Sequence, residues 1–376
     1  MSAGRGTVIA GGGTGGHIVP SLQIARALVA RGHEPSTIEL YGSRRGQEAT
    51  TWPTLEFPFT LLSGRGIRRS VAPAALWANA GAVFGLLWGC LRALGSFAAR
   101  RPRVVVVVGG YASFPAGLAA VLTRAPLVLV TTDAVPGAVN ALLARFAAVN
   151  AVAFPGTVMP RAQVTGTPVR ADLADLDRSG PGRATARAAL GLPGDRTTVV
   201  SVGGSLGALR INRAVAELAG HWPGGRGMTL FQVTGRRDYE QFARPEPAPE
   251  PGPDLYYRVV PFEDGLTTVF GAADVCVSRA GAMTVAELLL AGLPAILVPL
   301  PGAPRDHQTK NAQALVDAGA AILVPDAECS ADRLGAELTA LLADADRLRA
   351  MGQAARALSR PDAAVRVAEL VDAHAH

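Results

Sequence analysis

Several residue types are scarce in this sequence. Lys310 is the only lysine among 36 basic side chains, and the 376 residues include only three cysteines, Cys90, Cys276 and Cys329. The cysteines are far apart and have no metal-binding or redox spacing, so we expect no disulfide framework, no metal site and a reducing compartment. Aromatic residues are 5% of the chain, and no basic run is interleaved with them. We therefore expect no nucleic-acid partner.

The chain also lacks the pattern of a secretory leader. Its first dozen residues lead directly into an apolar run and a glycine loop, without a charged region, an apolar region and a cleavage site. This pattern predicts a cytoplasmic protein.

One long uncharged run is present, at 71–91. It is long enough to cross a bilayer, but Pro73 and several glycines interrupt it. Three arginines precede it and it contains aromatic side chains: Arg65, Arg68, Arg69, Trp77, Phe84 and Trp88. A membrane-surface helix, an ordinary packed helix and a transmembrane span all remain open.

Glycine, by contrast, is abundant, and it forms two similar loops. GGGTGGH at 11–17 and GGSLGA at 203–208 each follow an apolar run and precede a helical pattern. Glycine lets a backbone turn tightly and approach a ligand, and the amides that open the next helix bind phosphate oxygens. Two such loops indicate a duplicated architecture that handles two phosphate-bearing ligands.

The remaining pattern predicts an α/β fold with two Rossmann-like domains, because the chain exceeds one core in length and short β-rich runs alternate with helical patterns. The expected helices in the first half are 18–31, 115–122 and 139–147. The expected strands are 7–10, 36–41, 103–108, 127–132, 151–154, 199–202, 228–233, 255–260, 275–278, 295–298 and 321–324.

The turn-rich stretch 164–170 is the expected hinge. We predict an N-terminal domain at 1–168, a C-terminal domain at 169–358, and a C-terminal helix within 359–376, capped by Asp362, that returns to the first domain. The segment 244–254 is dense in proline and glutamate, which predicts a mobile surface excursion.

The first loop admits two interpretations. Gly11, Gly13 and Gly16 satisfy a dinucleotide-binding pattern with Glu39 at the distance of a ribose ligand, although the second loop and His17 argue against it. His17 lies where a helix N-terminus lowers the pKa of an imidazole, so it could accept a proton. A catalytic and a purely structural role for His17 both remain open.

The run 278–287 reads as a strand end, a loop and a helix start. Glu287 could accept both hydroxyls of a ribose, while the preceding backbone meets phosphate, or it could merely complement the helix dipole. The run DHQTKNA, at 306–312, opens another helix with groups suited to sugar hydroxyls.

Taken together, these motifs resemble the MurG family. They are GGGTGGH, Gly109-Gly110-Tyr111, the Pro-Val-Arg that ends at Arg170, GGSLGA followed by Asn212, the run 278–287 and DHQTKNA. They span nearly the whole chain in order. The family comprises peripheral membrane N-acetylglucosaminyltransferases of peptidoglycan synthesis, inverting enzymes of the two-domain GT-B type that convert lipid I to lipid II.

The resemblance implies a donor site for UDP-N-acetylglucosamine in the C-terminal domain. Ser205 would lie near the diphosphate, Glu287 on the ribose and Gln308 toward the sugar. The implied donor residues are Arg170, Gly204, Ser205, Gly207, Asn212, Phe262, Ala282, Met283, Thr284, Glu287 and Gln308.

The resemblance also implies an acceptor site for a lipid diphosphate at Thr14, Gly15, Gly16 and His17. It further implies that the parallel sheets of the two domains face a central cleft. The implied catalytic residues are His17, Tyr111 and Asp133. No metal and no cofactor is implied. The run 71–91 would dock on the inner face of the cell membrane.

Three positions depart from the family pattern. Val130-Thr131-Thr132-Asp133 stands where His-Glu-Gln-Asn is usual, Leu206 replaces a glutamine, and Phe114 replaces a small glycine. A related enzyme with another acceptor, a sugar-nucleotide epimerase and a nucleotide-sugar binding protein therefore remain as alternatives to lipid I glycosylation.

Overall fold

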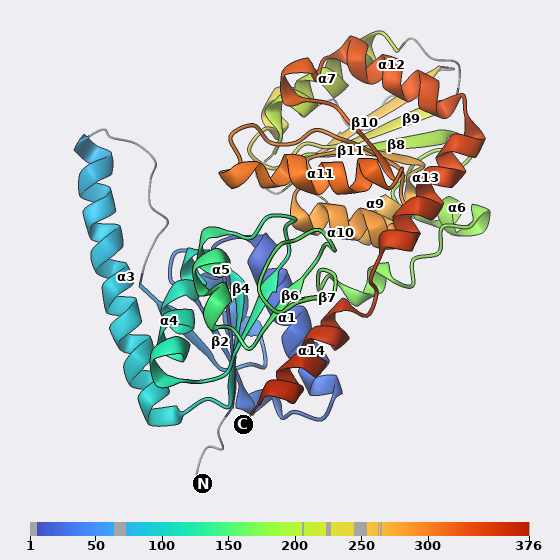
Figure 1. Cartoon of the computed structure of the whole chain (residues 1–376). Helices are drawn as coiled ribbons and strands as arrows, with labels where there is room; N and C mark the ends of the chain where they lie inside the picture. The colour runs from blue at the N-terminus through green and yellow to red at the C-terminus, as the bar shows by residue number, and fades with distance from the viewer. Residues whose placement is uncertain are drawn as a thin grey trace. The chain divides into compact units, whose positions relative to one another are not determined.

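The computed structural model describes residues 6–63, 73–204, 207–222, 227–243, 254–261, 263 and 265–375. It divides the chain into two compact units. Unit 1 comprises Met1–Arg170 and Arg360–His376, and unit 2 comprises Ala171–Ser359. Each unit is built on a wholly parallel sheet with helices on both faces (Figure 1). The predicted α/β class with two Rossmann-like domains is confirmed.

Unit 1 has a seven-stranded sheet in the order β3-β2-β1-β4-β5-β6-β7. The central strands are apolar throughout because both faces of the sheet are covered. The strands are β1 (Thr7–Gly11), β2 (Ile38–Ser43), β3 (Phe59–Leu62), β4 (Val104–Gly109), β5 (Leu127–Thr131), β6 (Val149–Val152) and β7 (Ala162–Val164).

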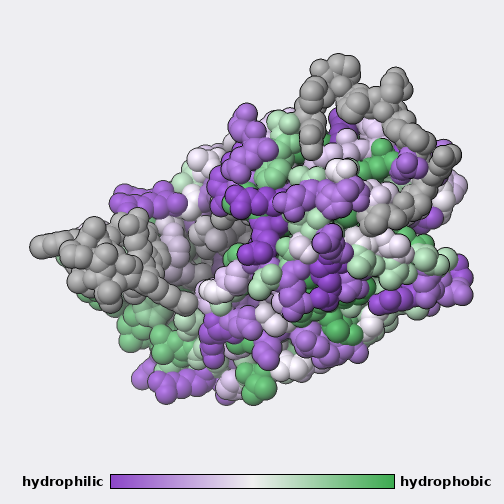
Figure 2. Space-filling view, turned by 90° about the horizontal axis from the view of Figure 1, so that it is seen from above, coloured by the Kyte–Doolittle hydropathy of each residue, from purple (hydrophilic) through white to green (hydrophobic). Residues whose placement is uncertain are grey.

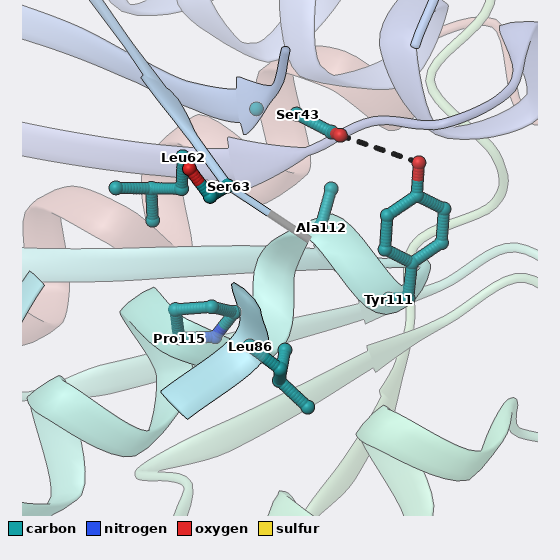
Figure 3. Close-up of a pocket in the computed structure, with 8 residues that line it drawn as sticks. Ser43, Leu62, Ser63, Leu86, Tyr111, Ala112 and Pro115 are labelled. Carbon is teal, nitrogen blue, oxygen red and sulfur yellow. Dashed lines mark hydrogen bonds between the residues drawn. The ribbon is translucent and has the colours of Figure 1, made fainter. Parts of the chain in front are cut away.

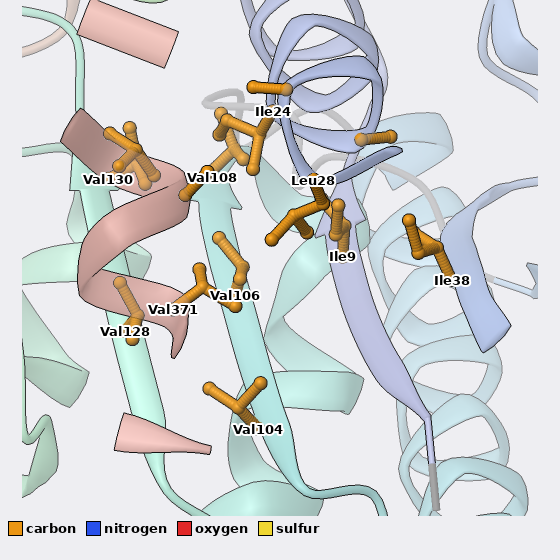
Figure 4. Close-up of a cluster of buried hydrophobic side chains, with 14 of the residues drawn as sticks. Ile9, Ile24, Leu28, Ile38, Val104, Val106, Val108, Val128, Val130 and Val371 are labelled. Carbon is orange, nitrogen blue, oxygen red and sulfur yellow. The ribbon is translucent and has the colours of Figure 1, made fainter. Parts of the chain in front are cut away.

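Two helices, α1 and the C-terminal α14, cover one face of this sheet. Ile24 and Leu28 from α1 and Val371 from α14 pack on Ile9 and Val106 of the strands (Figure 4). Helices α3 and α4 cover the other face. The helices of unit 1 are α1 (Gly15–Ala30), α2 (Glu48–Thr51), α3 (Pro73–Arg100), α4 (Phe114–Thr123), α5 (Ala138–Leu143) and α14 (Ala363–His374), with 3-10 turns η1 (Pro35–Thr37), η2 (Trp52–Thr54), η3 (Tyr111–Ser113) and η4 (Ala144–Phe146).

Unit 2 has a six-stranded sheet in the order β10-β9-β8-β11-β12-β13. Its strands are β8 (Thr197–Val202), β9 (Met228–Val233), β10 (Leu255–Val260), β11 (Val275–Ser278), β12 (Ala295–Leu297) and β13 (Ala321–Leu323). Its helices are α6 (Gly180–Ala189), α7 (Leu209–Gly220), α8 (Tyr239–Phe242), α9 (Leu266–Ala272), α10 (Ala282–Ala291), α11 (His307–Asp317), α12 (Ala331–Leu342) and α13 (Ala345–Leu358), with η5 (Ala171–Leu173), η6 (Pro304–Asp306) and η7 (Asp326–Glu328).

The structure corrects several local predictions. The short strands β3 and β7 were not predicted; they form the two edges of the sheet and are largely exposed or half-buried. Glu39 holds Thr60 and Arg100 through its carboxylate and is not placed as a ribose ligand. Asp362 precedes α14 but binds Arg366 instead of capping the helix. Of the segment 244–254, residues 244–253 lie outside the described ranges.

Candidate active site

The carboxyl ends of the central strands in unit 1 bring the predicted acceptor and catalytic residues to one edge of the sheet. Thr14 and His17 follow β1, Tyr111 follows β4, and Asp133 follows β5. In open parallel sheets this edge is where ligands bind. Helix α1 begins at Gly15, so the amides of its first turn open toward that edge.

The first glycine loop has a conformation that requires glycine. Gly13 has φ +90°, and a Cβ at this position would lie 3.0 Å from Cε1 of Tyr111. Thr14, which is exposed, precedes the helix, and its hydroxyl lies 3.2 Å from Nδ1 of His17. The loop therefore presents a hydroxyl and an imidazole beside the opening amides of α1.

His17 lies half-buried against the backbone of the loop that follows β4. A Cβ on Gly109 would be 3.1 Å from Cδ2 of His17, and one on Gly110 would be 3.1 Å from Nδ1. A Cβ at either position would make the ring shift, and both positions have a positive φ, +118° and +77°, that favours glycine. The ring therefore has a defined orientation, which both a proton acceptor and a phosphate ligand require.

Tyr111 is tied to the end of β2. Its hydroxyl donates to Oγ of Ser43 at 3.3 Å, across a small pocket that Leu62, Leu86 and Pro115 also line (Figure 3). The amide of Ser43 in turn donates to the carboxylate of Glu48 at 2.7 Å. Ser43 and Glu48 carry no local motif, so the sequence did not identify them.

Thr131 and Asp133, two residues that depart from the family pattern at the end of β5, differ in their burial. Thr131 is 3% exposed, and its hydroxyl accepts a hydrogen bond from Nδ2 of Asn140 at 2.9 Å. Asp133, in the loop two residues on, is half-buried. The threonine thus belongs to the interior of unit 1, whereas Asp133 is a half-buried acidic group in the loop at the edge.

Helix α3 has one buried and one exposed apolar face. Ala93 and Phe97 are buried in unit 1, whereas a series at helical spacing is exposed: Val83 46%, Phe84 72%, Leu87 59%, Trp88 58% and Leu91 63%. Hydrophobic residues gather at the left of Figure 2, the side on which Figure 1 draws α3. By length and composition, Gly81–Arg100 would suffice to cross a membrane. Residues 71–72 lie outside the described ranges.

The second glycine loop follows β8 in unit 2, in the same relation to its sheet. A Cβ on Gly203 would lie 2.9 Å from the carbonyl oxygen of Thr234, so the loop packs closely on the end of β9. Gly204 is exposed. Ser205 and Leu206, predicted in this loop, lie outside the described ranges, as does Phe262.

Asn212, predicted as a donor ligand, is fully buried beneath this loop. Its Nδ2 donates to the carbonyl of Thr234 at 2.9 Å and to Oδ2 of Asp238 at 3.1 Å. Gln232 donates to Oδ1 of Asn212 at 3.3 Å. In this structure the amide supports the loop from within, so its side chain does not present itself to a ligand.

The other predicted donor residues gather at two helix starts in unit 2. Ala282, Met283 and Thr284 are half-buried in the first turn of α10, and Glu287 follows one turn later with 7% exposure. Gln308 opens α11, where its Oε1 accepts the amide of Leu300 at 2.9 Å, which orients its Nε2 as a donor. Arg170 is half-buried and ends unit 1.

The large pKa shifts lie away from both loops. Burial lowers the pKa of Arg178 to about 10 and raises the pKa of Cys276 to about 12. Arg178 donates to the carbonyls of Ala273, Ala291 and Gly292, so it joins helix ends in unit 2. Within the described ranges, no three His, Cys, Asp or Glu side chains cluster as metal ligands.

Comparisons with known proteins indicate the same family for both halves of the chain. The glycosyltransferase family 28 N-terminal domain matches residues 7–152, and the family 28 C-terminal domain matches residues 198–367. A protein of Alkalilimnicola ehrlichii is 41% identical over 364 residues, 96% of this chain and 97% of its own. A Methylococcus capsulatus protein is 39% identical over 378 residues, 97% of this chain and 98% of its own.

Both relatives are named UDP-N-acetylglucosamine-N-acetylmuramyl-(pentapeptide) pyrophosphoryl-undecaprenol N-acetylglucosamine transferase. Among solved structures, MurG of Acinetobacter baumannii superimposes with a TM-score of 0.77 at 28% identity, and the match covers 98% of this chain and 99% of that one.

Proposed function

The chain belongs to glycosyltransferase family 28 and, within it, to the MurG enzymes, and we propose that it transfers N-acetylglucosamine from UDP-N-acetylglucosamine to the 4-hydroxyl of undecaprenyl-diphosphate-MurNAc-pentapeptide, which yields lipid II. The observation that carries the proposal is full-length similarity to relatives with this name. The two glycine loops, each at the carboxyl edge of its own parallel sheet, support it.

On the donor side, unit 2 offers groups for each part of the nucleotide sugar. The amides at the start of α10, from Ala282 to Thr284, and the loop after β8 suit the diphosphate. Glu287 takes the ribose hydroxyls, and Nε2 of Gln308 donates to the sugar. Backbone dipoles aimed at the leaving diphosphate stabilise the charge that develops as UDP departs.

On the acceptor side, the opening amides of α1 and Thr14 hold the lipid-linked diphosphate. His17 removes the proton from the 4-hydroxyl as its oxygen attacks the anomeric carbon and the bond to UDP breaks, so the sugar configuration inverts. The packing of His17 on Gly109 and Gly110 supports this role, because it orients the imidazole before substrate binds. Asp133 and Tyr111 belong to the same edge of the sheet.

The acceptor is lipid-linked, so the enzyme has to work at a membrane surface. The exposed apolar face of α3 supports peripheral docking, since Phe84, Leu87 and Trp88 would each leave water on binding. The same helix packs against unit 1 through Ala93 and Phe97, which favours a surface helix over a span. We accordingly assign the protein to the cytoplasmic face of the cell membrane.

The test is UDP release by the purified protein with and without a short-chain lipid I analogue, with product masses measured in parallel. Acceptor-dependent release and a disaccharide product support the proposal. Donor binding without transfer to the analogue contradicts it and directs the search to another acceptor. Conversion of UDP-N-acetylglucosamine without any acceptor would identify an epimerase instead.

A further inference from the structure

We propose that Glu48 is a positioning residue for the acceptor, a buried carboxylate that sets the shape of the first glycine loop so that the amides of α1 meet the lipid-linked diphosphate. The inference rests on the proposed function, and it goes beyond it by naming the group that shapes the acceptor site.

Glu48 is the first residue of α2 and has no exposed surface. Its two carboxylate oxygens lie 3.0 and 3.1 Å from the amide nitrogen of Gly13, and Oε1 also accepts the amide of Ser43 at 2.7 Å. None of the described residues forms an ion pair with it. Removing a carboxylate from water without a cation is costly, so amide donors are the compensation that this site provides.

The surrounding backbone leaves space for this carboxylate only because it is glycine. A Cβ on Gly12 or Gly46 would overlap the carboxylate oxygens, and one on Gly42 would lie 2.8 Å from Cγ of Glu48. Three glycines thus surround one side chain: Gly12 of the first glycine loop, Gly42 of strand β2 and Gly46 of the turn that follows β2. The first glycine loop and the end of β2 are therefore joined through Glu48.

A closed circuit of contacts extends this junction to η3, the turn that follows β4. Gly13 donates to Glu48, Glu48 accepts from Ser43, Ser43 accepts from the hydroxyl of Tyr111, and the ring of Tyr111 packs on Gly13. The circuit turns the amide of Gly13 inward. The amides of His17 and Ile18 donate to the carbonyl of Thr14, so the amides that α1 offers to a diphosphate are those of Gly15 and Gly16.

The charge and the geometry of Glu48 make opposite predictions. A negative charge beside the loop repels a diphosphate, so an electrostatic effect alone predicts that removing it strengthens binding. A positioning role predicts that removing it weakens binding, because a loop without its anchor presents misplaced amides. Whether removal of the charge strengthens or weakens diphosphate binding therefore distinguishes the electrostatic effect from the positioning role.

Unit 2 carries an acidic side chain at the equivalent place. Asp238 follows β9, the strand next to the one that leads into the second glycine loop, just as Glu48 follows β2. It is 2% exposed, its Oδ2 accepts from Asn212, and a Cβ on Gly207 would overlap it. A buried carboxylate beneath the glycine loop is thus a feature of both units.

The test compares Glu48→Gln with Glu56→Gln, which removes the same charge at an exposed position of unit 1. We measure KM for a short-chain lipid I analogue and for UDP-N-acetylglucosamine, and the Kd of farnesyl diphosphate by calorimetry. In E48Q the KM of the analogue and the Kd of farnesyl diphosphate should rise about tenfold. A change of this size corresponds to the loss of one hydrogen bond to a charged group. The KM of UDP-N-acetylglucosamine should stay within about twofold.

Unchanged or tighter binding of farnesyl diphosphate by E48Q overturns the proposal, and so does an equal rise of both KM values. If E48Q does not fold, Ser43→Ala interrupts the same circuit and should raise the KM of the analogue about threefold; no change overturns the proposal. If the native protein transfers no sugar, the proposed function fails, while the farnesyl diphosphate comparison still decides the role of Glu48. Absence of farnesyl diphosphate binding by the native protein overturns that role.

Discussion

The imidazole of His17 lies directly against Gly110, where an added Cβ would be 3.1 Å from Nδ1 of the ring and 2.6 Å from the carbonyl oxygen of Gly12. Gly110 also has φ +77°, a conformation that other residues rarely adopt. The candidate base of unit 1 is therefore oriented by a position that accepts only glycine.

Gly110→Ala should consequently destabilise unit 1 by about 1–3 kcal/mol and lower the transfer rate, because both the backbone strain and the contact with His17 act together. Chemical denaturation and initial rates measure the two effects. Gly95→Ala is the matched control, since a Cβ there meets open space within α3. This control should stabilise the protein by about 0.5–1 kcal/mol. A G110A variant as stable and active as the native protein would contradict the packing.

His17→Ala should lower kcat by roughly 100-fold or more if His17 removes the acceptor proton. The KM of UDP-N-acetylglucosamine should not change, because the donor groups at α10 and α11, Glu287 and Gln308 among them, belong to unit 2. His221→Ala removes a largely exposed histidine of unit 2 and should leave kcat unaltered. Near-normal turnover in H17A would assign His17 a structural role only.

Glu287→Gln should abolish discrimination between UDP and its 2′-deoxy analogue. The native protein should bind UDP about tenfold more tightly than the 2′-deoxy analogue, because the carboxylate accepts hydrogen bonds from the ribose hydroxyls. Glu217→Gln, at an exposed position of α7, should retain the preference. If E287Q retains it as well, Glu287 only complements the dipole of α10.

Replacing Phe84 and Trp88 together by serine should reduce binding to vesicles that contain anionic phospholipid by more than about tenfold. Each aromatic side chain contributes about 1.5–3 kcal/mol when it leaves water. Sedimentation with vesicles measures the effect, and transfer to a water-soluble acceptor should persist. Val158→Ser, at a position that is 91% exposed in unit 1, is the control. Equal sedimentation of all variants would rule out docking through α3.

Thiol labelling at pH 8 should spare Cys276 and Cys329 in the folded protein. Burial raises the pKa of Cys276 to about 12 and that of Cys329 to about 11. At pH 8 both side chains are therefore almost entirely thiols, and little of the reactive thiolate is present. Cys90 is half-buried, and burial raises its pKa too, so it should react slowly. All three should react after denaturation. Rapid labelling of native Cys276 would contradict its burial.

The features that the sequence predicted well are local ones. A strand, a glycine turn and a helix start lie within about a dozen consecutive residues, so both loops and most strands could be located from the pattern alone. Strands β3 and β7 were missed, because they are edge strands with partly exposed residues and lack the buried apolar run by which the other short strands were located.

Side-chain partners that come from different elements of the fold could not be predicted in this way. Thr131 and Asn212 stand in or beside family motifs, yet Asn140 and Asp238 hold them inside their units. Their burial depends on which helix packs on which strand, and this packing cannot be predicted from a local sequence pattern.

By itself, then, the sequence determined the family, the α/β class and the two glycine loops, since glycine permits those turns wherever the chain folds. Only the tertiary structure decided that β2 and β4 flank β1. That order brings Glu48 and Tyr111, which are far apart in the chain, to the two sides of Gly13. The physical reason is that hydrogen bonding between parallel strands, and not sequence distance, sets which carboxyl ends meet at one edge.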